Sequence, residues 1–223
     1  MTTVISDEIQ VNTQAVGAQI AQIITALDNG GWVVSWTTTL ADAAYIGNQA
    51  QVFSADGTKS GSELTVLPAA SVTYAAAITG LAGGDWLYTY ATPGLLDVYQ
   101  QRYNLDGTTD GSAVKVSTDT TNYKVYPTVT TLEDGGWVVA WQSSGQDGDG
   151  YGIYQQRYNA NGTVNGLETL VNTQVTGGET EADVTSLASG GWIVTWTSAA
   201  LDSEGYSLGV HAQIFDATGA KSG

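Results

Sequence analysis

Acidic side chains recur in the glycine-rich stretches of this chain, in a pattern that could bind a hard cation. The tightest group is Gln146-Asp147-Gly148-Asp149-Gly150. Calcium takes several carboxylate and carbonyl oxygens, which flexible loops can supply. We therefore expect calcium as a possible cofactor, with the candidate ligands Asp42, Asp97, Asp147, Asp149, Asp202 and Glu204. A plain solvated turn is the alternative, because the chain contains neither an EF-hand loop nor a Gly-Gly-x-Gly-x-Asp run.

Catalytic signatures are scarce. The single histidine, His211, falls in a predicted strand, where we expect a packing or edge role. The chain has no Gly-x-Ser-x-Gly elbow, no His-rich metal motif and no phosphate-binding Gly-Lys-Ser/Thr motif. Two facing carboxylates could hydrolyse a glycosidic bond, but the sequence singles out no pair. It therefore predicts no catalytic residues and a protein that is not an enzyme.

Four tyrosines at the ends of polar loops are candidates for ligand binding: Tyr45, Tyr99, Tyr151 and Tyr206. A tyrosine combines an apolar ring with a hydroxyl that can bond to a polar partner, a combination suited to a sugar. A glycan-binding role predicts that these rings are exposed in loops. A purely structural role predicts that they are buried between sheets.

A segment that occurs four times must position all of these residues. Gly30-Gly31-Trp32-Val33-Val34-Ser35-Trp36 returns in similar form around Trp86, Trp137 and Trp192, at intervals of 54, 51 and 55 residues. A period of this size is typical of repeat architectures. In the third copy, short Val- and Tyr-rich runs alternate with Gly, Asn and Asp turns, which predicts four antiparallel strands per unit. The alternating Trp residues are expected in the core, with a sugar-stacking platform as the less favoured alternative.

The start of the chain resembles the repeat segment that is missing after the last copy. Residues 8–13 match residues 168–173, which carry the fourth strand of the third copy, while the fourth copy stops before its own equivalent. The sequence therefore predicts an all-β, four-bladed β-propeller, closed into a ring by the N-terminal strand. A linear repeat stack or a pair of β-sandwiches is the alternative. The prediction is a single domain over 1–223, with repeats at about 14–66, 67–116, 117–171 and 172–223 plus 8–13.

The composition of the chain limits the classes of partner that it can bind. Six Lys plus Arg stand against 22 Asp plus Glu, a formal charge of −16. Such a surface repels nucleic acid and anionic membranes, so we expect neither nucleic-acid binding nor membrane insertion. There is no Cys, and no apolar run approaches the length of a membrane span. No cleavable N-terminal signal peptide is visible.

The motifs Gly135-Gly136-Trp137-Val138-Val139-Ala140-Trp141, Tyr154-Gln155-Gln156-Arg157-Tyr158 and Val171-Asn172-Thr173 resemble tandem repeats of large secreted bacterial proteins, the RTX-type, calcium-associated adhesins and surface proteins. The resemblance covers nearly the whole chain. It implies an extracellular or cell-surface location, export without a cleavable N-terminal signal, and calcium.

These observations together predict a non-catalytic extracellular binding or adhesion module. Its expected partner is a glycan or a cell-surface protein, and the oligomeric state stays open. The alternative is a structural spacer or self-assembling repeat without a small-molecule ligand.

Overall fold

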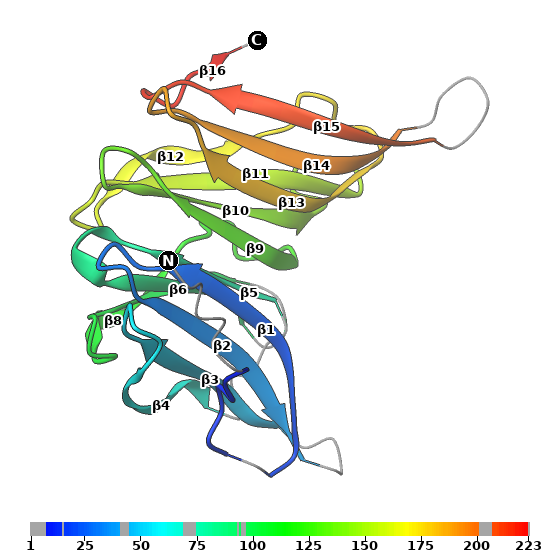
Figure 1. The fold of residues 1–223 in the computed structure, drawn as a ribbon. Helices are drawn as coiled ribbons and strands as arrows, with labels where there is room; N and C mark the ends of the chain where they lie inside the picture. The colour runs from blue at the N-terminus through cyan, green and yellow to red at the C-terminus, as the bar shows by residue number, and fades with distance from the viewer. Residues whose placement is uncertain are drawn as a thin grey trace.

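The structure is a computed structural model that describes residues 8–14, 16–40, 45–68, 75–92, 94, 97–200 and 207–222. The strands form four antiparallel sheets of four strands each, and each sheet follows the chain order of its strands. We call these sheets blades 1 to 4. Their arrangement is an all-β, propeller-type fold, as the repeat predicts (Figure 1).

Each blade runs from an inner to an outer strand. The strands of blade 1 are β1 (Ala18–Ala26), β2 (Trp32–Thr39), β3 (Tyr45–Phe53) and β4 (Lys59–Pro68). Those of blade 2 are β5 (Ala76–Gly80), β6 (Trp86–Ala91), β7 (Val98–Tyr103) and β8 (Thr109–Lys115), with the 3-10 turn η2 (Ala82–Gly84) after β5. Those of blade 3 are β9 (Lys124–Thr131), β10 (Trp137–Ser144), β11 (Tyr151–Tyr158) and β12 (Val164–Leu170). Those of blade 4 are β13 (Gly178–Ser186), β14 (Trp192–Ala200), β15 (Ser207–Phe215) and β16 (Lys221–Ser222).

The repeated Trp segment forms the second strand of every blade, and its alternation places side chains on two opposite faces. In blade 3, Trp137, Val139 and Trp141 are buried against blade 2, whereas Val138 and Ala140 are buried against blade 4. Both faces of an internal blade are therefore core, which explains why β10 is apolar at every position from Trp137 to Trp141. The Trp residues at these interfaces are structural, as expected.

Neighbouring blades are also joined by polar contacts at the Trp residues. Trp137 Nε1 donates to Gln100 Oε1 at 2.9 Å, and the Arg102 guanidinium lies 5.7 Å from the centre of the same indole. The next interface repeats the arrangement with Trp192, Gln155 and Arg157, at 2.9 Å and 5.4 Å. In the first interface, which joins blades 1 and 2, Ala50 and Val52 occupy the positions of the Gln and Arg. Trp86 Nε1 is buried there without a partner among the described residues.

The inner strands of blades 1, 3 and 4 carry a bulge at one equivalent position. The non-glycine residues Ala21, Tyr126 and Glu181 have φ angles of 54°, 52° and 58°, and the strand pairing shifts at each of them. A bulge bends a strand and redirects its side chains. Here it curves the inner strand where neighbouring blades meet.

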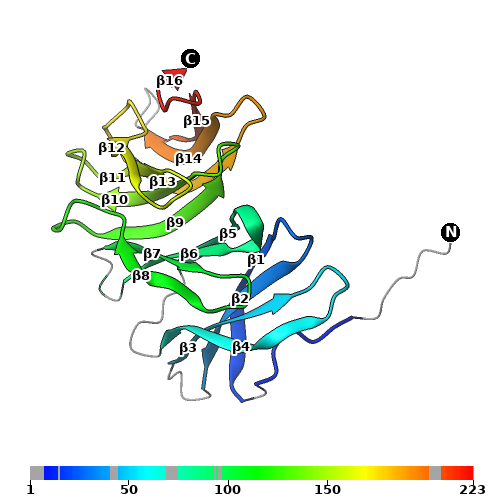
Figure 2. The same ribbon diagram turned by 90° about the vertical axis from the view of Figure 1, so that its left-hand side faces the viewer.

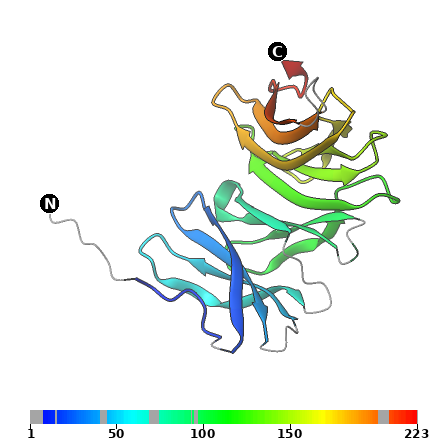
Figure 3. The same cartoon turned by 90° about the vertical axis from the view of Figure 1, so that its right-hand side faces the viewer.

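The blades lie in a curved row rather than in a closed ring. The inner strands of successive blades pack side by side, β1 with β5, β5 with β9 and β9 with β13, and blades 1 and 4 stand at opposite ends (Figures 2 and 3). Blade 4 has its own outer strand, β16, paired with Ile214 and Phe215. Residues 8–13 instead lie on blade 1, where Thr13 N donates to Glu63 Oε2 at 2.8 Å. The predicted closure by the N-terminal strand is therefore not the arrangement observed, because the segment has its contacts at the other end of the row.

Among the described residues, no helix has the length and apolar character needed to cross a membrane.

Candidate functional site

A polar site lies at the seam between blades 3 and 4. It brings together Asp147 in the loop between β10 and β11, Asn172 just after β12, and Glu179 near the start of β13. Two hydrogen bonds fix the backbone there. Val171 N donates to the Ile153 carbonyl at 2.7 Å, and Ile153 N donates to Asn172 Oδ1 at 2.8 Å. With its oxygen held by β11, the Asn172 side chain presents its Nδ2 toward the two acids.

Asn172 Nδ2 is shared by both carboxylates. Asp147 Oδ2 and Glu179 Oε2 each lie 3.3 Å from this nitrogen, and the Gln174 carbonyl accepts from it at 2.7 Å. Since both acidic oxygens lie within 3.3 Å of one atom, they are separated by no more than twice that distance. The seam therefore holds two carboxylates at close range.

Glu179 has no exposed surface. Burial raises the pKa of its carboxyl above the ordinary value, the Ser198 hydroxyl lowers it, and the charge of Asp147 raises it further. Ser198 Oγ donates to Glu179 Oε1 at 3.0 Å. The folded protein thus favours the protonated, neutral form of Glu179 to a higher pH than an exposed glutamate.

Asp147 is held close to a glycine. A Cβ on Gly152 would lie 2.6 Å from Asp147 Oδ2, so a larger residue there would displace the carboxylate. Within the described part of the chain, Asp147 Oδ1 is buried and has no hydrogen-bond partner. An unpaired buried carboxylate oxygen is costly, so this atom is free to take a proton donor, a cation or a substrate group.

Further acids surround the buried phenol of Tyr154. Burial raises the pKa of Tyr154 to about 12, and the charges of Asp147, Glu168 and Asp119 add to the shift. Asp119 itself is paired with the buried Lys124, whose Nζ lies 2.9 Å from Asp119 Oδ2. Burial opposes ionisation of Asp119, but bonds from Lys124, Asn122 and Thr121 outweigh it and hold its pKa well below the usual range.

This geometry suits acid–base chemistry. Two nearby carboxyl groups in different environments can divide the roles of proton donor and charged partner. Glu179 has the environment of a proton donor, and Asp147 lies beside it in a partly exposed loop. Hydrolysis of a glycosidic bond uses such a pair of carboxyl groups.

The predicted metal ligands that the structure describes, Asp97, Asp147 and Asp149, lie in two different blades. Asp147 and Asp149 share one loop, and Asp149 Oδ2 accepts from Gly177 N at 3.2 Å. Asp97 is in blade 2, where it forms an ion pair with Lys115. Asp42, Asp202 and Glu204 lie outside the described residues. In the part that is described, no three His, Cys, Asp or Glu side chains are grouped as a metal site.

Of the predicted ligand-binding tyrosines, Tyr99 and Tyr151 have described side chains, and these lie in different blades. Tyr99 is half-buried and stacks on Tyr90, with ring centres 6.0 Å apart. Tyr151 is half-buried at the start of β11. Tyr206 and the side chain of Tyr45 lie outside the described residues. Tyr99 and Tyr151 therefore do not form one aromatic platform.

Asn172 and Glu179 were not among the predicted site residues, yet a signal for them exists. Asn12-Thr13-Gln14 repeats as Asn172-Thr173-Gln174, and the equivalent of Glu179 in blade 1 is Gln19. The contact recurs as well, since Asn12 Nδ2 lies 3.4 Å from Gln19 Oε1. The residue at this repeat position differs between blades, with Gln19 in blade 1, Lys124 in blade 3 and a carboxyl at Glu179 in blade 4.

Comparison with known proteins gives likeness in fold only. No protein-family model and no curated protein sequence matches the chain. Solved structures do match. A Dyadobacter fermentans protein of unknown function has a TM-score of 0.62 at 12% identity, covering 94% of this chain and 64% of its own. A Penicillium chrysogenum alpha-L-arabinanase, complexed with arabinobiose, has a TM-score of 0.64 at 14% identity, covering 92% and 66%.

A third match is the GH93 alpha-L-arabinofuranosidase of Fusarium graminearum, with a TM-score of 0.62 at 10% identity, covering 92% of this chain and 65% of its own. The chain thus spans slightly less than two thirds of these three structures. The matching structures are mostly glycoside hydrolases. This finding overturns the prediction of a non-catalytic adhesion module or spacer, and with it the prediction that the chain is not an enzyme. Asp147 and Glu179 belong to segments more than 30 residues apart in the chain, so no linear motif points to them as a pair.

Proposed function

We propose that this protein is a carbohydrate-processing propeller that hydrolyses glycosidic bonds with the Asp147 and Glu179 pair. The observation that carries the proposal is the shared donor, since Asn172 Nδ2 lies 3.3 Å from both carboxylates. The fold is also one in which glycoside hydrolases are frequent among the matching structures.

The roles follow from the environments. Glu179, whose pKa is raised by burial, is the general acid that protonates the departing glycosidic oxygen. Asp147 is the second carboxylate, which attacks the anomeric carbon. The two oxygens lie within twice 3.3 Å of each other. That upper limit just reaches the lower end of the roughly 6.5–9.5 Å that leaves room for a water molecule in inverting enzymes, and every shorter separation lies nearer the roughly 5–5.5 Å of retaining ones.

Substrate access requires a local movement. Glu179 has no exposed surface, so the loop that carries Asp147 must open for a sugar to reach it. The loop is rich in glycine, and Gly145, Gly148 and Gly150 all have positive φ. Active-site loops of this kind commonly close over bound substrate.

The charge of the chain narrows the substrate class. A formal charge of −16 repels anionic sugars and favours neutral glycans. The resemblance to secreted bacterial repeats supports an extracellular setting for such an activity. Calcium stays a prediction, supported by the buried and unpaired Asp147 Oδ1.

The test is a panel of neutral arabino-, gluco- and galacto-configured glycosides, assayed with the wild-type chain, Asp147→Asn and Glu179→Gln. Glu179→Gln places at this position the residue that blade 1 already uses at Gln19, so the fold should be retained. Exposed Glu133→Gln is the matched control. Hydrolysis that is lost in both site variants and kept in the control supports the proposal. Hydrolysis of no panel member, or full activity of Glu179→Gln, would refute it.

A further inference from the structure

Residues 8–14 have the contacts of an outer-strand segment from a blade that would precede blade 1. Asn12 Nδ2 donates to the Gln14 carbonyl at 2.7 Å, just as Asn172 Nδ2 donates to the Gln174 carbonyl at 2.7 Å. Thr13 N donates to Glu63 Oε2 at 2.8 Å, and Thr118 N, after blade 2, donates to Glu168 Oε2 at 2.6 Å. The N-terminal segment therefore lies on blade 1 as each outer strand lies on the blade that follows it.

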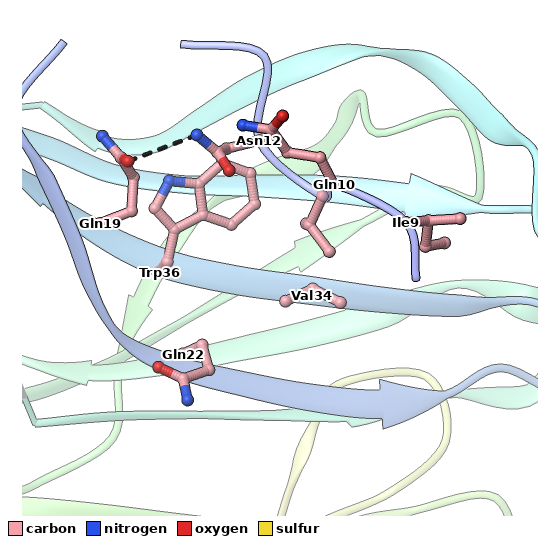
Figure 4. Close-up of a pocket in the computed structure, with 8 residues that line it drawn as sticks. Ile9, Gln10, Asn12, Gln19, Gln22, Val34 and Trp36 are labelled. Carbon is pink, nitrogen blue, oxygen red and sulfur yellow. Dashed lines mark hydrogen bonds between the residues drawn. The ribbon is translucent and has the colours of Figure 1, made fainter. Parts of the chain in front are cut away.

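A pocket on blade 1 lies where the strand that pairs with residues 8–14 would pack, as β11 packs at the seam between blades 3 and 4. A cavity of about 320 Å³ lies between residues 9–12 and the face of blade 1 that carries Val34 and Trp36 (Figure 4). At the equivalent seam between blades 3 and 4, Ile153 of β11 is fully buried in the cluster that holds Val171, Val194 and Trp196. The pocket on blade 1 is thus the unfilled counterpart of the Ile153 position.

The side chain that corresponds to Ile153 is exposed at the other end of the row. It is Val210 of β15, which is 84% exposed beside Leu208 at 65% and Ile214 at 43%. Within the described residues, β16 pairs only with Ile214 and Phe215. The edge of β15 from Leu208 to Ala212 therefore has no strand partner there, although the same edge of β11 pairs with β12 through Tyr154 and Leu170.

The two open faces match in chemistry as well. At the first interface, Ala50 and Val52 are buried in one cluster with Trp86. Blade 4 carries Ala212 and Ile214 at the positions of Ala50 and Val52, and blade 1 offers Trp32 at the position of Trp86. The open end of blade 4 is thus built like the surface that already receives a Trp face within the chain.

We propose that blade 4 of one copy docks on blade 1 of a second copy, with Val210 in the pocket and β15 paired with residues 9–12. The occupant is a second copy because both halves of the contact belong to this chain but stand at opposite ends of the row (Figure 1). The contact is head-to-tail, with different surfaces on the two partners. An exposed strand edge supplies the main-chain hydrogen bonds.

Cysteine pairing tests the register. The chain has no Cys, so Gln10→Cys/His211→Cys has only the two introduced thiols. Those positions correspond to the directly paired Leu170 and Tyr154. Oxidation is expected to give covalent multimers on a denaturing gel, which thiol reduction removes. A disulfide-closed single chain would overturn the second-copy proposal, and so would the absence of any disulfide.

Complementation tests the head-to-tail geometry. Val210→Asp disables one face, Val11→Asp disables the other, and Val210 is exposed enough for the first change to leave the fold intact. Sedimentation should show concentration-dependent association of the wild type, monomers of each variant alone, and one-to-one dimers in their mixture. A wild type that is monomeric at high concentration would contradict the proposal. So would self-association of either variant, since that requires a symmetric contact.

Discussion

Asp147 and Glu179 come from different blades and accept from the same atom, the Nδ2 of Asn172, at 3.3 Å each. This arrangement depends on how blade 4 packs against blade 3. Ile153 N of β11 donates to Asn172 Oδ1 and so holds the Asn172 amide. The start of β13 places Glu179 beside that amide. Burial raises the pKa of Glu179 above its ordinary value, which leads to the first prediction.

The first prediction concerns pH and stability. Because the pKa of folded Glu179 is raised above its ordinary 4.5, its protonated form fits the fold best. The stability it contributes is complete below pH 4.5 and is lost as pH rises through the folded pKa. Glu179→Gln should therefore melt at a higher temperature than the wild type at pH 8, with the gain shrinking toward pH 4. A gain that is independent of pH, or present in Glu133→Gln, would contradict this assignment.

The second prediction concerns the blade interfaces. Gln155→Ala removes the acceptor of Trp192 Nε1 and leaves a buried N–H unpaired. The expected cost is about 1–3 kcal/mol of unfolding free energy. Denaturant unfolding of Gln155→Ala, Trp192→Phe and the double variant gives the interaction free energy between the two side chains. Additive effects would mean that the two side chains do not interact in solution.

The third prediction concerns the inner-strand bulge. Glu181 has a φ of 58°, a region in which a side chain is unfavourable. Glu181→Gly and Glu181→Ala both lose the bond from Thr197 Oγ1. Their difference therefore reports the backbone alone, and the Gly variant should be more stable by about 1 kcal/mol. If the Ala variant is equally stable in chemical denaturation, the bulge is absent in solution.

Several features of the fold are predictable from the sequence alone. The period of the Trp segment, the four strands of each unit and the core role of Trp137 are all local patterns, and the structure confirms them. Gln101, two residues before Tyr103, holds the backbone of the turn that follows, because its Nε2 donates to the Gly111 carbonyl at 3.2 Å.

The curvature of the row was not predictable in the same way. It depends on the angles at three interfaces, which no short motif encodes. Residues 8–13 are similar to residues 168–173, but that similarity does not say on which end of the row they lie. The Asp147 and Glu179 pair was missed for a related reason, because its members are joined through Asn172 rather than by sequence spacing.

The fourth prediction concerns calcium. If Asp147 and Asp149 bind calcium, the metal should raise the melting temperature relative to excess chelator, because binding to the folded state alone stabilises it. Asp149→Asn should reduce the shift, and magnesium at equal concentration is the control. An unchanged melt would remove calcium from this account.

The most direct test of the central claim is the dependence of Glu179→Gln on the leaving group. A general acid matters most when the departing oxygen is basic and least when it is an activated phenol. On whichever neutral glycoside the wild type hydrolyses, kcat/KM of Glu179→Gln should fall by about 10²–10⁴-fold for an alkyl leaving group, and far less for dinitrophenol. An equal loss on both substrates, or no loss, would contradict the assignment of Glu179 as the proton donor.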